Sequence, residues 1–263
     1  AYLHTIHSQQ SLKDNVLDGI LTRGSFLYDE VRFVLQQELR EPRNYFAILQ
    51  AIAAGKTRLN EIKQATGIEG ATAYLDTLQQ LHLVERLVPV TETQPQKSRR
   101  GIYRLKDHYL RFWFRYVHPN RSQLERGGAQ IILENQVIPE IDHFSSLTFE
   151  EACRQFFWQA GLSGKLPFVP TNIGNWWNAN EEVDLVILGE NDATLVECKW
   201  TSKPVGIDIL AELERKSNLV KHELGDRQIR FALCSRSGFS SQLTEDTKRR
   251  QDITLLNLPE IVG

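Results

Sequence analysis

The sequence predicts an α+β protein, in which a helical segment and a winged helix-turn-helix precede an α/β domain with a central mixed sheet. Three observations predict this fold class. Apolar residues recur at helical spacing through most of the first 160 residues, three helical patterns and a hairpin pattern fill residues 43–106, and β-branched apolar runs separated by turns fill residues 166–258. The patterns divide the chain into residues 1–40, 41–106, 107–145 and 146–263.

The first part, residues 1–40, is predicted to be helical. Its segments LKDNVLDGIL (12–21) and YDEVRFVLQQEL (28–39) place apolar residues three and four positions apart. That spacing gives each helix one face that can be buried.

The second part, residues 41–106, has the layout of a winged helix-turn-helix. Three helical segments, with Gly55 and Gly67 at helix ends, precede the hairpin segments LVPVTE (87–92) and GIYRL (101–105). The third helix would be the recognition helix, but it carries acids and no arginine before its last residue. The wing between 91 and 101 supplies the basic residues, which are Lys97, Arg99 and Arg100. We expect these to contact DNA; the alternatives are a solvated loop and a protein-binding module.

The third part, residues 107–145, is predicted to connect the two domains through helices. In YLRFWFRYVHPNRS (109–122) the aromatic residues form a buried helical stripe and the arginines face water or acids, although such residues can also stack bases or contact phosphates. A second helix, AQIILENQVI (129–138), is expected to stop at Pro139 and to lead through a polar hinge into the last part.

The last part, residues 146–263, alternates helices and strands. An amphipathic helix, LTFEEACRQFFWQAG (147–161), begins it, and Thr148 and Glu151 resemble a capping box. Strands are predicted within 166–177, 180–188, 192–200, 227–235 and 252–258, with a crossover helix at 204–224. On that helix Asp208, Glu212 and Lys216 form a four-residue charge ladder, which is typical of a solvated face.

Two carboxylates and a lysine lie on neighbouring predicted strands. Asp184 lies in NEEVDLVIL (180–188), and Glu197 and Lys199 lie in DATLVECKW (192–200). Because side chains alternate along a strand, Glu197 and Lys199 share one face and Cys198 takes the other. Carboxylate oxygens suit Mg²⁺ or Mn²⁺, and a nearby lysine can orient or help to deprotonate a water and neutralise charge on a phosphate. The pattern therefore predicts a metal-dependent phosphodiesterase site.

Through this pattern, residues 146–263 resemble the PD-(D/E)XK restriction-endonuclease-like superfamily. The resemblance implies a magnesium-dependent endodeoxyribonuclease, in which Asp184, Glu197 and Lys199 match the core motif and Glu150 matches the acid of the first helix, an accessory metal ligand. Glu151 is an alternative, but its role in the capping box favours Glu150. Val183 stands where the motif usually has proline.

The whole chain resembles the C-terminal half of the archaeal-type P-loop ATPases, which carries the DUF234 domain. The segments that carry this resemblance are RGSFLYDE (23–30), LREPRNYFAIL (39–49), GKTRLNEI (55–62), YLRFWFRYVHPNRS (109–122) and FEEACR (149–154). The resemblance implies that residues 1–40 are a remnant of the helical lid of an ATPase. It also implies an ATPase domain as partner, and ATP binding only through that N-terminal region. The GKT at 55–57 is not a P-loop, because Gln50 replaces the required glycine and a helix runs into Gly55.

Composition and charge limit the classes of partner that the chain can have. The chain is 41% hydrophobic and 24% charged, which is typical of a folded protein with sizeable cores. Residues 146–263 contain 13 Lys and Arg against 17 Asp and Glu, so a DNA substrate would rely on local contacts, and Lys203 and Arg236 are candidates. No membrane span or signal peptide is visible, so we expect a cytoplasmic protein without a membrane partner; a homo-oligomer stays open.

The sulfur-containing residues are few. Cys153, Cys198 and Cys234 lie in apolar segments without CxxC spacing, and we expect reduced core residues rather than a zinc site or disulfides. The chain begins at Ala1 and contains no methionine, which is typical of a fragment; the alternative is that modified methionines are missing from the sequence as printed.

Three functions therefore stay open on the sequence. The first is a metal-dependent DNA endonuclease domain attached to an ATPase. The second is a DNA-binding winged-helix regulator with an inactive nuclease scaffold, and the third is a module that interacts with an ATPase.

Overall fold

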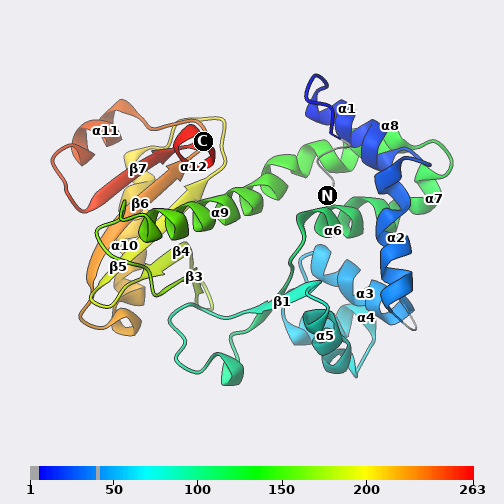
Figure 1. Cartoon of the computed structure of the whole chain (residues 1–263), viewed down its shortest axis with the longest axis horizontal. Coiled ribbons are helices and arrows are strands. Elements are labelled where there is room, and N and C mark those ends of the chain that lie inside the picture. The colour runs from blue at the N-terminus through cyan, green and yellow to red at the C-terminus, as the bar shows by residue number, and fades with distance from the viewer. Residues whose placement is uncertain (1–5, 40–41) are drawn as a thin grey trace. The chain divides into compact units, whose positions relative to one another are not determined.

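The computed structural model describes residues 6–39 and 42–263, which form two compact units (Figure 1). The N-terminal unit runs to Leu87 and resumes from Gly101 to Ile141, and the C-terminal unit comprises Val88–Arg100 and Asp142–Gly263. Residues 1–5 and 40–41, which belong in part to the predicted helical segment 1–40, lie outside the described residues. The protein is α+β, as predicted: helices come first, and a mixed sheet with further helices follows.

The N-terminal unit contains the predicted helices and hairpin. Its first helices are α1 (Leu12–Val16), which continues as a π-helical turn to Leu21, and α2 (Phe26–Glu38). Three helices and an antiparallel hairpin follow, namely α3 (Pro42–Ala53), α4 (Leu59–Thr66), α5 (Ala71–Gln80), β1 (Val84–Leu87) and β2 (Ile102–Leu105). The first hairpin strand is VERL rather than the predicted LVPVTE, because Pro89 cannot donate a ladder hydrogen bond.

The aromatic segment forms a buried helical stripe, as predicted. It comprises α6 (His108–Phe112), a π-helical stretch (Trp113–Val117), a 3-10 turn (His118–Asn120) and α7 (Arg121–Leu124). Trp113 and Tyr116 are buried, and Trp113 Nε1 donates to the carbonyl of Tyr28 at 2.8 Å. Of the arginines predicted to face water or acids, Arg115 lies 2.8 Å from Glu140, whereas Arg111 is buried. Trp113, Tyr116 and Arg115 therefore make their contacts within the N-terminal unit.

The C-terminal unit is built on a mixed sheet with the order β3–β4–β5–β6–β7 (Figure 1). Its strands are β3 (Asn172–Trp177), β4 (Glu182–Leu188), β5 (Asp192–Lys199), β6 (Gln228–Ser235) and β7 (Ile253–Asn257). The first three strands pair antiparallel, and β5, β6 and β7 pair in parallel. A parallel neighbour needs a crossover, and α10 (Ile207–Leu224) provides it between β5 and β6.

Helices cover both faces of this sheet. On one face the core joins α10 to strand residues such as Leu195 and Leu233. On the other face, α9 (Ile138–Leu162) and α12 (Leu258–Val262) pack against residues such as Ile187 and Cys198. A further helix, α11 (Ser241–Thr247), precedes β7. The alternation along β5 therefore separates Cys198 from Glu197, as predicted.

The predicted break at Pro139 is wrong. The segment α8 (Ala129–Ile132) passes through a π-helical turn (Leu133–Val137) into α9, and α9 continues without interruption from Ile138 to Leu162. Pro139 is separated from that π-helical turn by one residue, so the irregular turn precedes the residue that cannot donate a backbone hydrogen bond. Thr148 consequently lies inside a helix, so the predicted capping box of Thr148 and Glu151 does not form.

The segment 88–100, which contains most of the wing predicted between 91 and 101, packs within the C-terminal unit. The backbone N–H of Val90 donates to the carbonyl of Asn175 on β3 at 2.9 Å. Gly174 admits this approach, because a Cβ there would lie 3.2 Å from the Cβ of Val90. The Arg100 guanidinium lies 3.3 Å from Glu223 of α10 and 3.3 Å from Glu92, and Trp177 Nε1 donates to the Arg100 carbonyl at 3.1 Å. Arg100 thus anchors the segment.

Over residues 6–39 and 42–263, none of the helices combines the length and the apolar character that crossing a membrane requires.

Candidate active site on strands β4 and β5

Asp184 lies where β4 and β5 separate. The paired register of the two strands runs from Leu188 and Ala193 to Leu185 and Val196 and stops there. Beyond that point Asp184 Oδ2 accepts a hydrogen bond of 2.7 Å from the backbone N–H of Cys198. The carboxylate therefore replaces the strand partner that this N–H would otherwise have.

Glu197 is a buried carboxylate held by two lysines. Its side chain is 8% exposed; Oε1 lies 2.5 Å from Nζ of Lys199 and Oε2 lies 3.2 Å from Nζ of Lys216. Lys199 is on the same strand and face, as predicted, whereas Lys216 extends from α10. Burial of a carboxylate is costly unless the carboxylate is paired with a positive charge and hydrogen-bonded. Each oxygen of Glu197 has a lysine partner.

Lys216 was missed by the sequence analysis, which placed it in a solvated charge ladder. The structure buries Lys216 on α10, among Leu213, Ser217 and Val220. The available signal was its position within the apolar stripe of that helix, where a charged residue needs a buried partner.

The pKa of Asp184 is raised first by burial and then by neighbouring carboxylates. Burial raises the pKa of Asp184 well above its usual value, and the charges of Glu197 and Glu150 raise it further. The Cys198 N–H and the charge of Lys199 act in the opposite direction but do not reverse the shift. Accumulated carboxylates of this kind favour either a proton or a bound cation.

Lys199 is held in its charged form. Burial lowers the pKa of Lys199, but the hydrogen bond and charge of Glu197 and the charge of Asp184 outweigh burial, so the pKa is raised above its ordinary value. Lys199 is therefore a persistent positive charge beside the two carboxylates.

The two acids on α9 differ in their surroundings. Glu150 is half-buried, and its charge acts on Asp184. The carboxylate of Glu151 instead binds its own helix, with Arg154 Nη2 at 2.5 Å and Gln155 Nε2 at 2.8 Å. This arrangement favours Glu150 as the accessory ligand, for a different reason from the capping box that the sequence suggested.

The donor chemistry of the residues present suits a hard divalent cation. Asp184, Glu197 and Glu150 offer carboxylate oxygens, which are the donors that Mg²⁺ and Mn²⁺ prefer. Burial raises the pKa of Asp184, and the charges of Glu197 and Glu150 raise it further, so a positive charge close to Asp184 would stabilise its ionised form. A cation would compete with Lys199 and Lys216 for the oxygens of Glu197.

The region that holds these residues matches a known family. Residues 113–217 match the DUF234 family, described as "Archaea bacterial proteins of unknown function". They belong to the DUF234 family. The DUF234 region includes Glu150, Asp184, Glu197, Lys199 and Lys216.

Relatives of the chain extend beyond its length. The uncharacterized protein MJECL04 of Methanocaldococcus jannaschii is 38% identical over 202 residues, which cover 74% of this chain and 45% of that protein. The chain thus spans less than half of this curated relative.

Two solved structures are similar at a much lower level. Can2 from Sulfobacillus thermosulfidooxidans, in complex with cyclic tetra-adenylate, is 15% identical, with 87% of this chain and 52% of that chain covered and a TM-score of 0.29. Protein VC1899 from Vibrio cholerae is 16% identical, with 96% and 54% covered and a TM-score of 0.29. Similarity of this degree carries no argument about the function of the DUF234 region.

The basic residues predicted to contact DNA have different environments. Lys97, Arg99 and Lys203 are exposed, whereas Arg100 is paired as described above. Arg236 lies over the Trp200 ring at 4.6 Å and pairs with Asp142 at 3.3 Å. Exposure leaves Lys97, Arg99 and Lys203 available for a phosphate, and Arg100 is committed to the fold.

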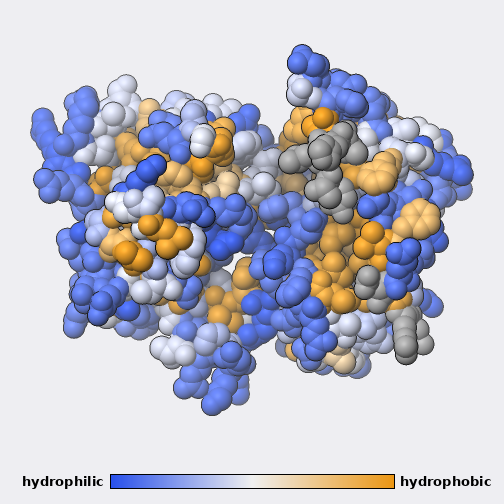
Figure 2. Space-filling model, viewed as in Figure 1, coloured by the Kyte–Doolittle hydropathy of each residue, from blue (hydrophilic) through white to orange (hydrophobic). Residues whose placement is uncertain are grey.

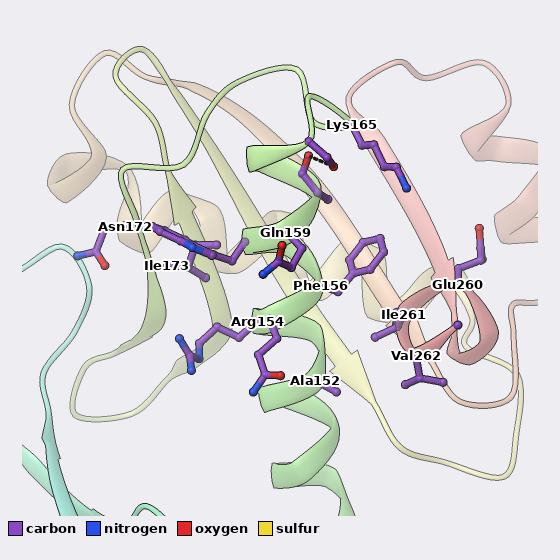
Figure 3. Close-up of a pocket in the computed structure, with 15 residues that line it drawn as sticks. Ala152, Arg154, Phe156, Gln159, Lys165, Asn172, Ile173, Glu260, Ile261 and Val262 are labelled. Carbon is purple, nitrogen blue, oxygen red and sulfur yellow. Dashed lines mark hydrogen bonds between the residues drawn. The ribbon is translucent and has the colours of Figure 1, made fainter. Parts of the chain in front are cut away.

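A pocket of ≈850 Å³ lies on the α9 side of the C-terminal sheet. Figure 3 shows Arg154, Phe156 and Gln159 of α9 lining it, together with the start of β3 and α12. Figure 2 shows hydrophobic residues among hydrophilic ones at the molecular surface. Two residues that line the pocket, Trp158 and Val262, are 40% and 61% exposed. The lining does not include Asp184, Glu197 or Lys199, so the pocket is separate from the carboxylates of the DUF234 region.

Proposed function

We propose that the DUF234 region is a divalent-metal-dependent phosphodiesterase that cleaves DNA. The observation that carries the proposal is the arrangement at the diverging ends of β4 and β5. Asp184 receives the Cys198 N–H at 2.7 Å, and Glu197 lies next along the strand with Lys199 at 2.5 Å. Carboxylates from adjacent strands, a lysine on the same face and an acid from α9 are the components that metal-assisted phosphodiester hydrolysis needs.

Asp184 and Glu197 would hold the cation, with Glu150 as an accessory ligand. When bound, a divalent cation lowers the pKa of a water molecule and offsets negative charge on a phosphate. The backbone of Cys198 orients Asp184 through a hydrogen bond, and Lys216 orients Glu197 from α10. These contacts fix the carboxylates before a substrate arrives, which reduces the reorganisation required in the transition state.

Lys199 would act by its charge. In the metal-free protein the hydrogen bond and charge of Glu197 raise the pKa of Lys199, and a protonated lysine is poorly suited to accept a proton from water. Its ammonium can instead hold a phosphate oxygen and stabilise the negative charge that develops there. The sequence left two roles open for Lys199, deprotonation of a water and neutralisation of charge on a phosphate. We infer the second.

The test is metal-dependent nicking of supercoiled plasmid, together with cleavage of single-stranded DNA. Wild-type protein should cut at least one substrate with Mg²⁺ or Mn²⁺. Asp184→Asn, Glu197→Gln and Lys199→Met should abolish cleavage, whereas Glu190→Gln, an exposed carboxylate on the β4–β5 turn, should not. Folded wild-type protein without activity on DNA, or variants that cut as well as wild type, would remove the proposal.

A second function is favoured by one observation, the double pairing of Glu197 with Lys199 and Lys216. Two lysines can neutralise that carboxylate without a metal, which is compatible with a nuclease scaffold that has no activity. The chain would then act as a DNA-binding winged-helix regulator or as a module that interacts with an ATPase. In that case DNA binding would weaken in Arg99→Ala and in Lys97→Ala, and the dependence of binding on salt concentration would become less steep, while Asp184→Asn would leave binding unchanged.

A further inference from the structure

The three cysteines of the chain come together in space. Cys153, Cys198 and Cys234 are spread over 82 positions of the sequence and lie on three elements, α9, β5 and β6. All three are buried and free of disulfides, and their Sγ atoms lie within 4.8 Å of one another. A free buried cysteine is ordinary, but a chain that uses cysteine three times and gathers all three thiols at one point has a potential ligand set.

The sheet register explains part of this convergence. Cys198 and Cys234 are direct partners in the parallel pairing of β5 and β6, so their side chains stand next to each other on one face. Helix α9 crosses that face and adds Cys153, and Phe149 and Phe157 of the same helix pack into the surrounding apolar core. The three elements therefore bring the thiols together inside a buried, mainly apolar core.

The spacing suits a metal ion. Thiolate ligands lie about 2.3 Å from Zn²⁺, and sulfurs in tetrahedral positions at that distance are about 3.8 Å apart. Thiols already within 4.8 Å of one another need to move by no more than about 1 Å each to reach that geometry. Hard ions such as Mg²⁺ would not choose sulfur, whereas soft ions do.

We propose that Cys153, Cys198 and Cys234 supply three thiolate ligands to a soft, thiophilic metal ion of the Zn²⁺ or Cu⁺ class. Each thiol that binds releases its proton to solvent, and the three sulfurs bind as thiolates. Because the site is buried, the ion enters while the chain folds.

The site would stabilise the region around the carboxylates. Cys153 follows Glu150 by three positions, one turn of α9, and Cys198 lies between Glu197 and Lys199 and donates its N–H to Asp184. An ion held by these thiols would tie the helix that carries Glu150 to the strand that carries Glu197. The inference stands without the proposed nuclease activity, because it concerns only the thiols.

The experiment reconstitutes the full chain. Reduced, unfolded protein is refolded with Cd²⁺ as a spectroscopic probe for Zn²⁺, excess metal is removed, and bound cadmium and the thiolate-to-metal charge-transfer absorption are measured. The expected result is one ion per chain with the charge-transfer band. X-ray absorption should count three sulfur neighbours, and loss of the band is expected in Cys153→Ala, Cys198→Ala and Cys234→Ala.

A matched control separates thiol chemistry from core packing. Val196→Ala removes atoms from the same strand and the same core as Cys198 but leaves every thiol, so it should lower the melting temperature and keep the band. If a cysteine variant does not fold, the number of sulfur neighbours that X-ray absorption gives for cadmium in the wild-type protein still tests the proposal. Refolded wild type without bound cadmium, or cadmium surrounded by oxygen or nitrogen, would overturn the proposal, as would a band that survives in all three cysteine variants.

Discussion

Lys216 of α10 lies 3.2 Å from Oε2 of Glu197, at the end of β5 that holds the candidate site. Both side chains are almost fully buried, with 11% and 8% of their surfaces exposed. The pair therefore links the crossover helix to the carboxylate and leaves Lys199 on the other oxygen.

Lys216→Met should destabilise the protein. The variant keeps the length of the side chain but leaves Oε2 of Glu197 buried without its hydrogen-bond donor, which costs about 1–3 kcal/mol. Urea unfolding measures the difference. Lys221→Met, which removes an exposed charge from the same helix, should change the free energy of unfolding much less, and equal effects in the two variants would contradict the assigned contact.

Asp184→Asn should stabilise the metal-free protein at neutral pH relative to wild type. The pKa of Asp184 is raised on folding, first by burial and then by Glu197 and Glu150. Below the ordinary pKa of aspartate both states are protonated; as pH rises, the unfolded chain releases this proton first, and the stability of wild type falls until folded Asp184 has also ionised. An asparagine cannot titrate, so its variant lacks this decline.

The measurement is the free energy of unfolding of both proteins, without divalent metals, from acidic to neutral pH. The difference between Asp184→Asn and wild type should grow with pH. Glu190→Gln, at an exposed position, should follow the wild-type curve. A difference that stays constant or shrinks with pH would show that the pKa of Asp184 is not raised.

Arg100→Ala should destabilise the C-terminal unit, by about 1–2 kcal/mol. The substitution removes the charge that pairs with Glu223 and Glu92, and the guanidinium also donates to the Trp177 carbonyl. Its neighbour Arg99 is exposed, so Arg99→Ala is a matched control and should have little effect on stability. The double-mutant cycle of Arg100→Ala with Glu223→Gln should give a favourable coupling energy; additive effects would remove the ion pair from the account.

The sequence was sufficient for features that depend on local periodicity. Alternation along β5 correctly placed Glu197 and Lys199 together and Cys198 on the opposite face. The strands and the crossover helix were also predicted, because their apolar runs are bounded by turn residues.

Features that depend on tertiary contacts were not predictable in the same way. Pro139 is typical of a helix stop, yet the helix continues through it directly after the π-helical turn of Leu133–Val137. The basic residues of segment 88–100 look solvated, and only the packed structure shows that Arg100 has a partner on α10. The meeting of the three cysteines depends on the register of β5 and β6 and on the path of α9, and sequence spacing records neither.

The central claim is that Asp184 and Glu197 bind a divalent cation, and titration calorimetry with Mn²⁺ tests it most directly. We predict saturable binding to wild type, loss of that binding in Asp184→Asn, and retention in Glu190→Gln. A wild-type protein that binds no Mn²⁺ at millimolar concentration, or an Asp184→Asn variant that binds it as wild type does, would contradict the account.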